Sequence, residues 1–150
     1  MATQDTDNDA ALPGGAPLEQ LLVSKERSTV KVKALVHATR AGDPASAAAV
    51  RKHIATETNP FVLATMASVL GRAGTAGDAD LLTPLLDHAD ARVVANALQA
   101  LYLQRVDIAP DRLVELAKRD DTRVRANALA ILGRYNPEFV MERIASLSES

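Results

Sequence analysis

A block of nine residues returns after 31 positions in this chain. The segment DARVVANAL, residues 90–98, reappears as DTRVRANAL at residues 121–129. Repetition at a fixed period of this size is typical of a solenoid, because a single unit cannot bury its own apolar face and must stack on its neighbours. The repeat therefore predicts a fold made of similar units stacked along one axis.

Candidate helix N-caps recur at the same interval. Ser28, Asn59, Asp90 and Asp121 follow one another at spacings of 31 residues, and their side-chain oxygens can accept hydrogen bonds from the free N–H groups of a first turn. Each is predicted to open the second helix of a hairpin. Prolines suit the first helical position and mark further helix starts: Pro17, Pro44, Pro60, Pro110 and Pro137, three of which follow the caps Asp43, Asn59 and Asn136.

Large and small apolar residues repeat in separate rows. In the second helices the rows are Val62, Val93 and Val124; Ala64, Ala95 and Ala126; and Leu70, Leu101 and Leu132. In the preceding helices they are Leu82, Leu113 and Ile144, and Ile54, Leu85, Leu116 and Leu147. Rows that keep residue size from repeat to repeat indicate buried contacts between stacked helical hairpins.

These patterns predict an all-α protein. We expect about four hairpins, near residues 17–41, 43–74, 78–105 and 109–135, and a final helix over 137–147. The helical domain would span 17–150, after a leader at 1–16 that is too poor in apolar residues to order itself. The first hairpin fits least well, because Lys31 occupies the position of Val62, Val93 and Val124; we interpret it as a modified cap.

The third and fourth units resemble the HEAT repeat. The third carries LLTPLLDHADARV at residues 81–93, and the fourth carries two Asp, a Val-Arg pair and a Leu-Gly ending. The resemblance covers 43–135 well and 17–41 weakly. Because the period is below the usual value of about 40 to 47 residues, the compact bacterial type of HEAT repeat is the better match. It implies a right-handed α-α superhelix that binds another protein on the concave side lined by the second helices.

Two other repeat families fit less well. The segment Thr83-Pro84-Leu85 is similar to the Thr-Pro-Leu-His signature of ankyrin repeats, but it occurs once and Leu86 follows it. A tetratricopeptide array needs a period of about 34 residues with Trp, Gly and Tyr positions, which this chain does not have. HEAT remains the favoured resemblance.

The composition offers no catalytic constellation. The chain has no cysteine, which excludes disulfides and thiolate chemistry. His37, His53 and His88 form no HExxH or His-Glu pair, and no Gly-x-Ser-x-Gly element is present. We therefore predict no catalytic, cofactor-binding or metal-binding residues, and a protein that is not an enzyme.

Charge and hydropathy bear on partners and location. The net charge is −2, and without residues 1–17, which carry Asp5, Asp7 and Asp9, the remainder is +1. Such a body gives no general attraction for nucleic acid or for membranes. No secretory signal or membrane span is apparent, so a cytoplasmic location is expected.

One polar strip is predicted to face the concave side. With 100° per residue, Arg92, Asn96 and Gln99 lie opposite the apolar centre of their helix, and the strip continues into the helices on either side. Partner contacts are predicted from eight residues: Phe61, Arg72, Arg92, Asn96, Gln99, Arg123, Asn127 and Arg134. A solvated face would explain the same charges.

Asn96 and Asn127 have two interpretations. In the related armadillo repeats a column of asparagines holds an extended peptide, which would make these residues ligand contacts. Alternatively, a partly buried asparagine bonds the adjoining loop or the next repeat and fixes the stacking register. The second interpretation is favoured.

The sequence favours a non-enzymatic scaffold that binds a protein or peptide, either as a complete protein or as the regulatory N-terminal part of a larger one. Self-association through the terminal repeats is a further expectation. The main alternative is an enzyme similar to the bilin lyases, which use short HEAT repeats; a visible spectrum of added bilin that the protein leaves unchanged would argue against it. A HEAT-like DNA glycosylase fits neither the charge nor the lack of Trp.

Overall fold

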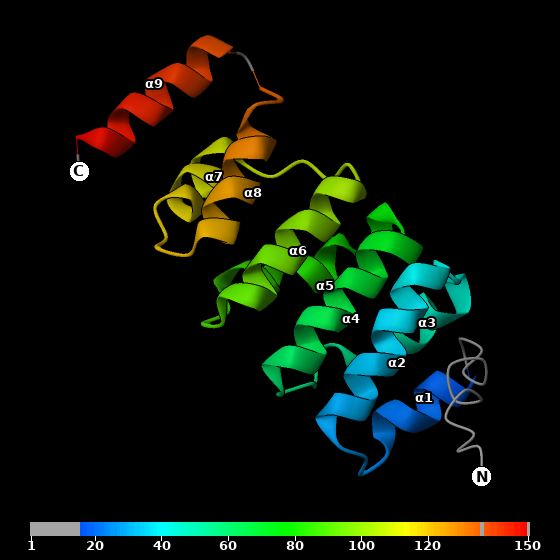
Figure 1. Cartoon of the computed structure of the whole chain (residues 1–150). Helices are drawn as coiled ribbons and strands as arrows, with labels where there is room; N and C mark the ends of the chain where they lie inside the picture. The colour runs from blue at the N-terminus through cyan, green and yellow to red at the C-terminus, as the bar shows by residue number, and fades with distance from the viewer. Residues whose placement is uncertain (1–15, 136, 150) are drawn as a thin grey trace, which may run out of the picture.

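The computed structural model describes residues 16–135 and 137–149, in which every regular element is helical (Figure 1). In chain order the elements are α1 (Ala16–Val23), α2 (Ser28–Ala41), α3 (Pro44–His53), α4 (Pro60–Ala73), the 3₁₀ turn η1 (Ala76–Asp78), α5 (Ala79–Leu82), the 3₁₀ turn η2 (Thr83–Asp87), α6 (Ala91–Leu103), α7 (Pro110–Ala117), α8 (Thr122–Leu132) and α9 (Pro137–Ser148). The predicted leader lies outside the described residues, apart from Ala16, which begins α1.

The helices form the predicted α-solenoid. Helices α2, α4, α6 and α8 lie side by side in chain order and are called here the second-helix layer; α3, the α5 segment and α7 lie behind them (Figure 1). Helix α1 contacts α2 and α3 at one end, and α9 contacts α7 at the other. The core runs continuously through these stacked hairpins.

Side-chain caps explain where most helices begin. Asp43, Asn59, Asp90 and Asp121 each accept a hydrogen bond from a backbone N–H in the first turn of α3, α4, α6 and α8, as predicted. Ser28 was wrong as a cap. The cap of α2 is Arg27, which makes no side-chain cap bond, and Ser28 is already helical; its Oγ accepts a hydrogen bond from Nδ2 of Asn59 at 3.0 Å. Asn136 lies outside the described residues.

The third hairpin departs from a regular first helix. Its first arm is divided into η1, α5 and η2, and Pro84 stands at the start of the second 3₁₀ turn. Proline has no N–H for an i→i−4 hydrogen bond and its ring crowds the preceding turn. The α-helix therefore ends at Leu82, and a tighter 3₁₀ turn follows.

The predicted apolar rows are buried with few exceptions among the residues whose burial the structure describes, which do not include Ile144 and Leu147. Leu85 is only partly buried. Val62, Val93 and Val124 are at most 1% exposed, and Leu70, Leu101 and Leu132 are fully buried. Ala64 and Ala95 are buried, but the prediction was wrong for Ala126, which is exposed. Ala64 and Ala95 each lie under the next helix of the layer, whereas Ala126 is on α8, the last helix of that layer.

Lys31 shows why the first hairpin breaks the pattern. Its ammonium nitrogen donates a hydrogen bond to the carbonyl oxygen of Leu22 at 3.0 Å, in the last turn of α1. Carbonyl groups at a helix end have no partner within the helix, and a cation is favoured there. The lysine therefore joins α2 to the terminal helix where the other hairpins use valine for the core.

A buried ion pair joins the second hairpin to the third. Asp78 is 3% exposed, and its carboxylate accepts hydrogen bonds from Arg51 Nε at 2.5 Å and Nη2 at 3.0 Å, and from the Thr75 N–H at 2.8 Å. Burial disfavours the charged carboxylate, but the bonds from Arg51 and Thr75 outweigh it and lower the pKa of Asp78 below its ordinary value. The pair therefore holds η1 against α3.

Candidate partner-binding surface

The eight residues predicted for the strip all map to the second-helix layer or its edge. Phe61 and Arg72 are on α4; Arg92, Asn96 and Gln99 are on α6; Arg123 and Asn127 are on α8, and Arg134 follows it. Phe61 is 54% exposed, and Gln99, Arg72, Arg123 and Arg134 are also exposed. The two asparagines and Arg92 are partly buried.

Arg92 is already held by its own chain. Its guanidinium lies 3.6 Å from the ring centroid of Phe61, and its Nη2 donates to Asp90 Oδ2 at 2.7 Å. The hydrogen bond from Arg92 lowers the pKa of Asp90 to about 2, against the opposing effect of burial. Arg92 therefore links the start of α6 to Phe61, the residue one repeat earlier.

Two further arginines of the strip also have intramolecular partners. Arg123 Nη2 donates to Asn96 Oδ1 at 2.9 Å, and the Arg134 guanidinium lies 3.5 Å from the ring centroid of Tyr102. In each case a side chain reaches back to α6. Arg123 and Arg134 are therefore exposed to solvent and at the same time contact residues of the neighbouring helix.

Asn96 and Asn127 make the same contact one repeat apart. Asn96 Nδ2 donates to the carbonyl oxygen of Ala64 at 2.9 Å, and Asn127 Nδ2 donates to that of Ala95 at 3.1 Å. Each amide thus bonds the helix one repeat earlier, as the structural interpretation of these residues predicts. The hydrogen bonds fix the register between adjacent second helices.

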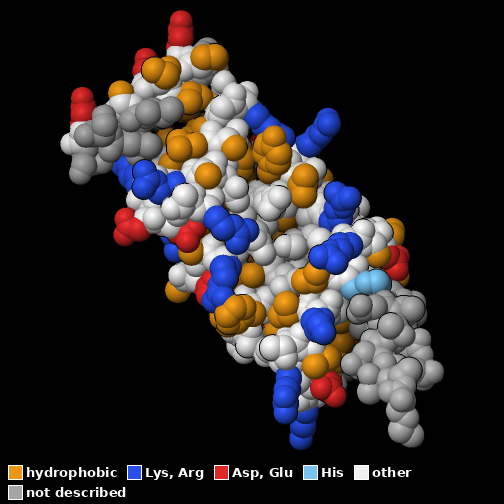
Figure 2. All heavy atoms as spheres, viewed as in Figure 1, with side chains coloured by type: hydrophobic (Ala, Val, Ile, Leu, Met, Phe, Trp, Pro, Cys, Tyr) orange, Lys and Arg blue, Asp and Glu red, His pale blue; other side chains and the backbone are white. Residues whose placement is uncertain are grey.

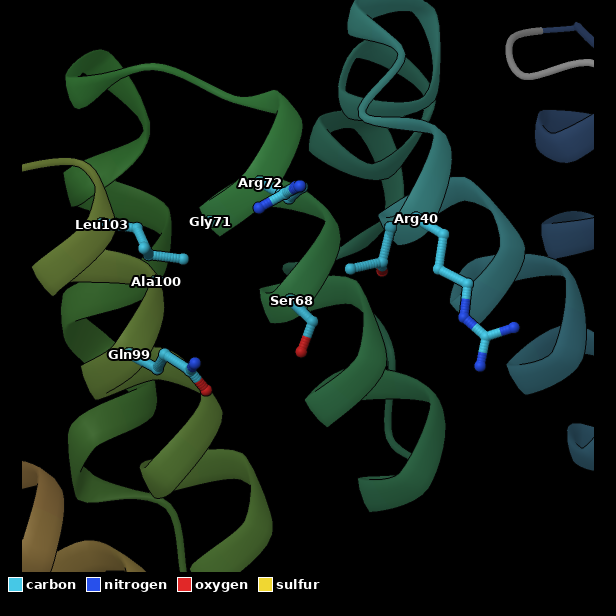
Figure 3. A pocket seen from close by; sticks show the side chains of 8 residues that line it. Arg40, Ser68, Gly71, Arg72, Gln99, Ala100 and Leu103 are labelled. Atoms are coloured by element: carbon cyan, nitrogen blue, oxygen red, sulfur yellow. The ribbon is translucent and has the colours of Figure 1, made fainter.

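A hollow of about 370 Å³ lies across α2, α4 and α6 (Figure 3). Arg40 and Arg72 line it from α2 and α4, and Gln99 and Leu103 line it from α6. Gly71 explains how α6 comes so close to α4: a Cβ added at this residue would be 2.7 Å from Ala100 Cα. The absence of a side chain at Gly71 leaves the floor of the hollow to backbone and to Ala100.

Sequence reasoning missed Arg40 as a member of this surface. It lies 31 positions before Gly71, in the first hairpin, where the repeat pattern is weakest. The repeat register pairs it with Gly71, which has no side chain that could have marked the position as part of a polar surface. Gln99 also lines a second hollow of about 170 Å³ between α6 and α8, with Tyr102, Asn127, Ala130 and Ile131.

The second-helix layer carries basic residues and no acidic ones. Helices α2, α4, α6 and α8 contain no Asp or Glu, and Lys and Arg are distributed over this face (Figure 2). Their basic residues are Lys31, Lys33, Arg40, Arg72, Arg92, Arg123 and Arg125. The small net charge of the chain therefore hides a concentration of positive charge on these four helices.

A family model of HEAT repeats matches residues 15–102, more than half of the 150-residue chain. The chain belongs to the HEAT-repeat family. The match includes the first HEAT hairpin, which resembled the family only weakly in sequence. No curated protein and no solved structure matches the chain.

The described residues of this HEAT protein contain neither a cluster of metal-ligating side chains nor a membrane-spanning helix. Among them, no three His, Asp or Glu side chains come together as a metal-ligand set would require. A membrane span would need a longer and more continuously apolar helix than any in this part of the chain. What the surface offers is guanidinium groups, an exposed amide and apolar side chains.

Proposed function

We propose that this HEAT-repeat protein is a non-enzymatic scaffold that holds another protein on its second-helix layer. The observation that carries the proposal is the distribution of exposed large apolar side chains. Among the described residues, five of the seven lie on the four helices of this layer, and none lies on α3, α5 or α7. The five are Val30, Val36, Phe61, Leu103 and Leu129.

Three of the five lie in the register of the strip: Val30 and Phe61 occupy the position of Arg92, and Leu103 occupies that of Arg72 and Arg134. Exposed apolar groups gathered in this way mark an interaction surface, because single surface leucines elsewhere need no explanation but a clustered set does. Phe61 and Leu103 are 54% and 50% exposed. They alternate along the layer with arginines and Gln99, which supply hydrogen bonds at the edge of an apolar contact. An apolar centre with a polar rim is the usual composition of a protein–protein interface.

Site-specific photo-crosslinking in a lysate of the source organism tests this proposal. A photoreactive residue would replace Gln99 or Leu103 on the second-helix layer, and, as matched controls, Asp80 or Lys118, exposed residues of the other layer. We expect a discrete adduct from the first two positions and none from the controls. Adducts only from Asp80 and Lys118, or from no position, would contradict it.

Binding of bilin separates the scaffold from the lyase-like alternative. A scaffold should leave the visible spectrum of added bilin unchanged. A shifted spectrum, followed by transfer of the bilin to an acceptor protein, would contradict the scaffold function and support an enzymatic one.

A further inference from the structure

Arg40, which lies outside the predicted strip, and Arg72, which belongs to it, differ from the remaining arginines of the strip. Arg92, Arg123 and Arg134 have intramolecular partners. Within the described part of the chain, Arg40 and Arg72 form no ion pair and no side-chain hydrogen bond. Both lie in the last turn of their helices, where a cation is favoured, but that interaction leaves the guanidinium N–H groups without acceptors.

Arg40 lines the 370 Å³ hollow from α2 and Arg72 lines it from α4. In Figure 3 the Arg40 side chain extends along α2, away from Ser68. The stem of Arg72 runs past the turn after α2, since a Cβ added at Gly42 would be 3.9 Å from Arg72 Cγ. Arg72 is thereby placed next to the end of the helix that carries Arg40. The opposite wall is Leu103 and the exposed amide of Gln99, as Figure 3 shows.

We infer that this hollow, called here the arginine cleft, binds an acidic segment of the partner protein. This inference rests on the proposed function. Carboxylates of the segment pair with Arg40 and Arg72, because guanidinium groups bind carboxylates through two parallel hydrogen bonds. An aliphatic side chain of the segment covers Leu103, which is 50% exposed.

Charge complementarity supports this occupant. No acidic side chain on α2, α4, α6 or α8 competes for the two arginines, so an incoming carboxylate meets an uncompensated positive surface. The smaller hollow shares Gln99 with the arginine cleft and continues towards α8. A segment lying across α4 and α6 can therefore occupy both hollows.

The cleft suits a peptide better than a nucleic acid. A phosphate backbone gains nothing from the apolar wall formed by Leu103 and Ala100. Single-stranded nucleic acid is held largely by stacking of bases on aromatic rings, and the rings of Phe61 and Tyr102 are already stacked with Arg92 and Arg134. An acidic peptide uses both the charged wall and the apolar wall.

Fluorescence anisotropy with three labelled probes tests the inference on the full chain. The probes are a short peptide of Glu and Leu, a matched peptide of Gln and Leu, and a single-stranded oligonucleotide. We expect the Glu–Leu peptide to bind and its affinity to fall with added salt, because exposed charges are screened. Tighter binding of the oligonucleotide, equal binding of the two peptides or no binding of the Glu–Leu peptide would overturn the inference.

The double variant Arg40→Gln with Arg72→Gln should weaken binding of the Glu–Leu peptide by about tenfold or more, since two charged contacts are lost. The matched control is Lys25→Gln with Lys118→Gln, which removes the same charge at two exposed positions away from the cleft and should change affinity little. Circular dichroism verifies that both variants are folded. Equal affinity of the two variants would contradict the cleft.

The crosslinking experiment distinguishes this inference from the proposed function. If the arginine cleft is the site, the adduct formed from Leu103 in the wild type should be lost in the double arginine variant. An adduct that persists in this variant would support the second-helix layer as the binding surface but would contradict the arginine cleft as the binding site. Adducts from the opposite layer alone would contradict both.

Discussion

The side-chain amide of Asn127 donates a hydrogen bond to the backbone carbonyl of Ala95, on the neighbouring second helix, at 3.1 Å. Ala95 is on α6 and Asn127 is on α8, so the bond joins two helices that are one repeat apart. Asn96 has the same relation to Ala64. A polar contact that recurs with the sequence period sets the register of the stack, which apolar packing alone specifies less sharply.

Replacing Asn96 or Asn127 with Ala should therefore destabilise the fold. The change removes the inter-helix hydrogen bond to a backbone carbonyl, and we expect a loss of about 1–3 kcal/mol in the free energy of unfolding. Urea denaturation followed by circular dichroism measures it. Gln99→Ala is the matched control, because this exposed amide of the same helix has no such bond, and it should stay within about 0.5 kcal/mol of wild type.

The fold was predictable because its determinants are local and periodic. Caps at Asn59, Asp90 and Asp121 act within one helical turn, and the buried Val and Leu rows repeat every 31 residues. Ser28 shows the limit of such reasoning. The cap of α2 is Arg27, one residue earlier, and the Ser28 hydroxyl instead accepts a hydrogen bond from Asn59. The prediction that Ala126 is buried was wrong, because burial at this position requires a further helix packed against α8, and the 31-residue period alone does not show whether one follows.

The candidate surface was only partly predictable. Helical spacing placed Arg92 and Arg123 on the second-helix layer, but it could not show that one stacks on Phe61 and the other bonds Asn96. These contacts depend on side-chain conformations across two helices. Arg40 was missed because the cleft depends on the close approach that Gly71 permits between α4 and α6.

Truncating Leu101 or Leu132 to Ala should cost about 2–5 kcal/mol of stability, because both side chains are fully buried and leave a cavity. In a stack, the loss should spread to the neighbouring hairpin, which hydrogen exchange would show as reduced protection there. Leu103→Ala is the matched control, since this leucine of α6 is half exposed. A denaturation midpoint that moves no further for Leu101→Ala than for Leu103→Ala would contradict the packing.

Gly71→Ala should destabilise the protein although alanine is the better helix former. In an unobstructed helix interior the change is favourable by about 1 kcal/mol, but here the added Cβ would lie 2.7 Å from Ala100 Cα. Forcing α4 and α6 apart should cost about 1–3 kcal/mol. The control is Gly77→Ala, whose Cβ would meet only the Thr75 hydroxyl at 3.4 Å; thermal unfolding should rank Gly71→Ala clearly below it.

Asp78→Asn should be among the most disruptive single substitutions outside the apolar core. It removes the charge that pairs with Arg51 at a residue that is 3% exposed. Because the Arg51 side chain is itself 35% exposed, we expect a loss of about 1–3 kcal/mol, the cost of leaving a buried hydrogen-bonding group without its partner. Asp80→Asn, two residues later and exposed, should have little effect. Equal urea midpoints for the two variants would show that the Arg51 contact contributes nothing to stability.

The ion pair between Asp90 and Arg92 should make stability depend on acid pH. The pKa of Asp90 is lowered to about 2 in the folded protein, whereas an unfolded Asp titrates near pH 3.9, about its ordinary value. A carboxylate with a lowered folded pKa contributes its full stabilisation above the unfolded pKa and loses it as the pH falls through the folded one. Because the Arg92 side chain is 43% exposed, solvent screens the pair and its contribution to stability should be small.

Asp90→Asn tests this dependence, since asparagine retains the capacity to cap α6 but cannot form the ion pair. Urea denaturation at a series of pH values should show wild type more stable than the variant at pH 7, with the difference disappearing as the pH falls from about 4 to about 2. Asp121→Asn is the matched control: Asp121 caps α8 in the same way, but Arg123 bonds Asn96 instead of its cap. Equal losses of stability for Asp90→Asn and Asp121→Asn at neutral pH would contradict this prediction. The charge on Asp90 would then contribute nothing to stability, and only the contact of Arg92 with Phe61 would remain as a stabilising role for this arginine.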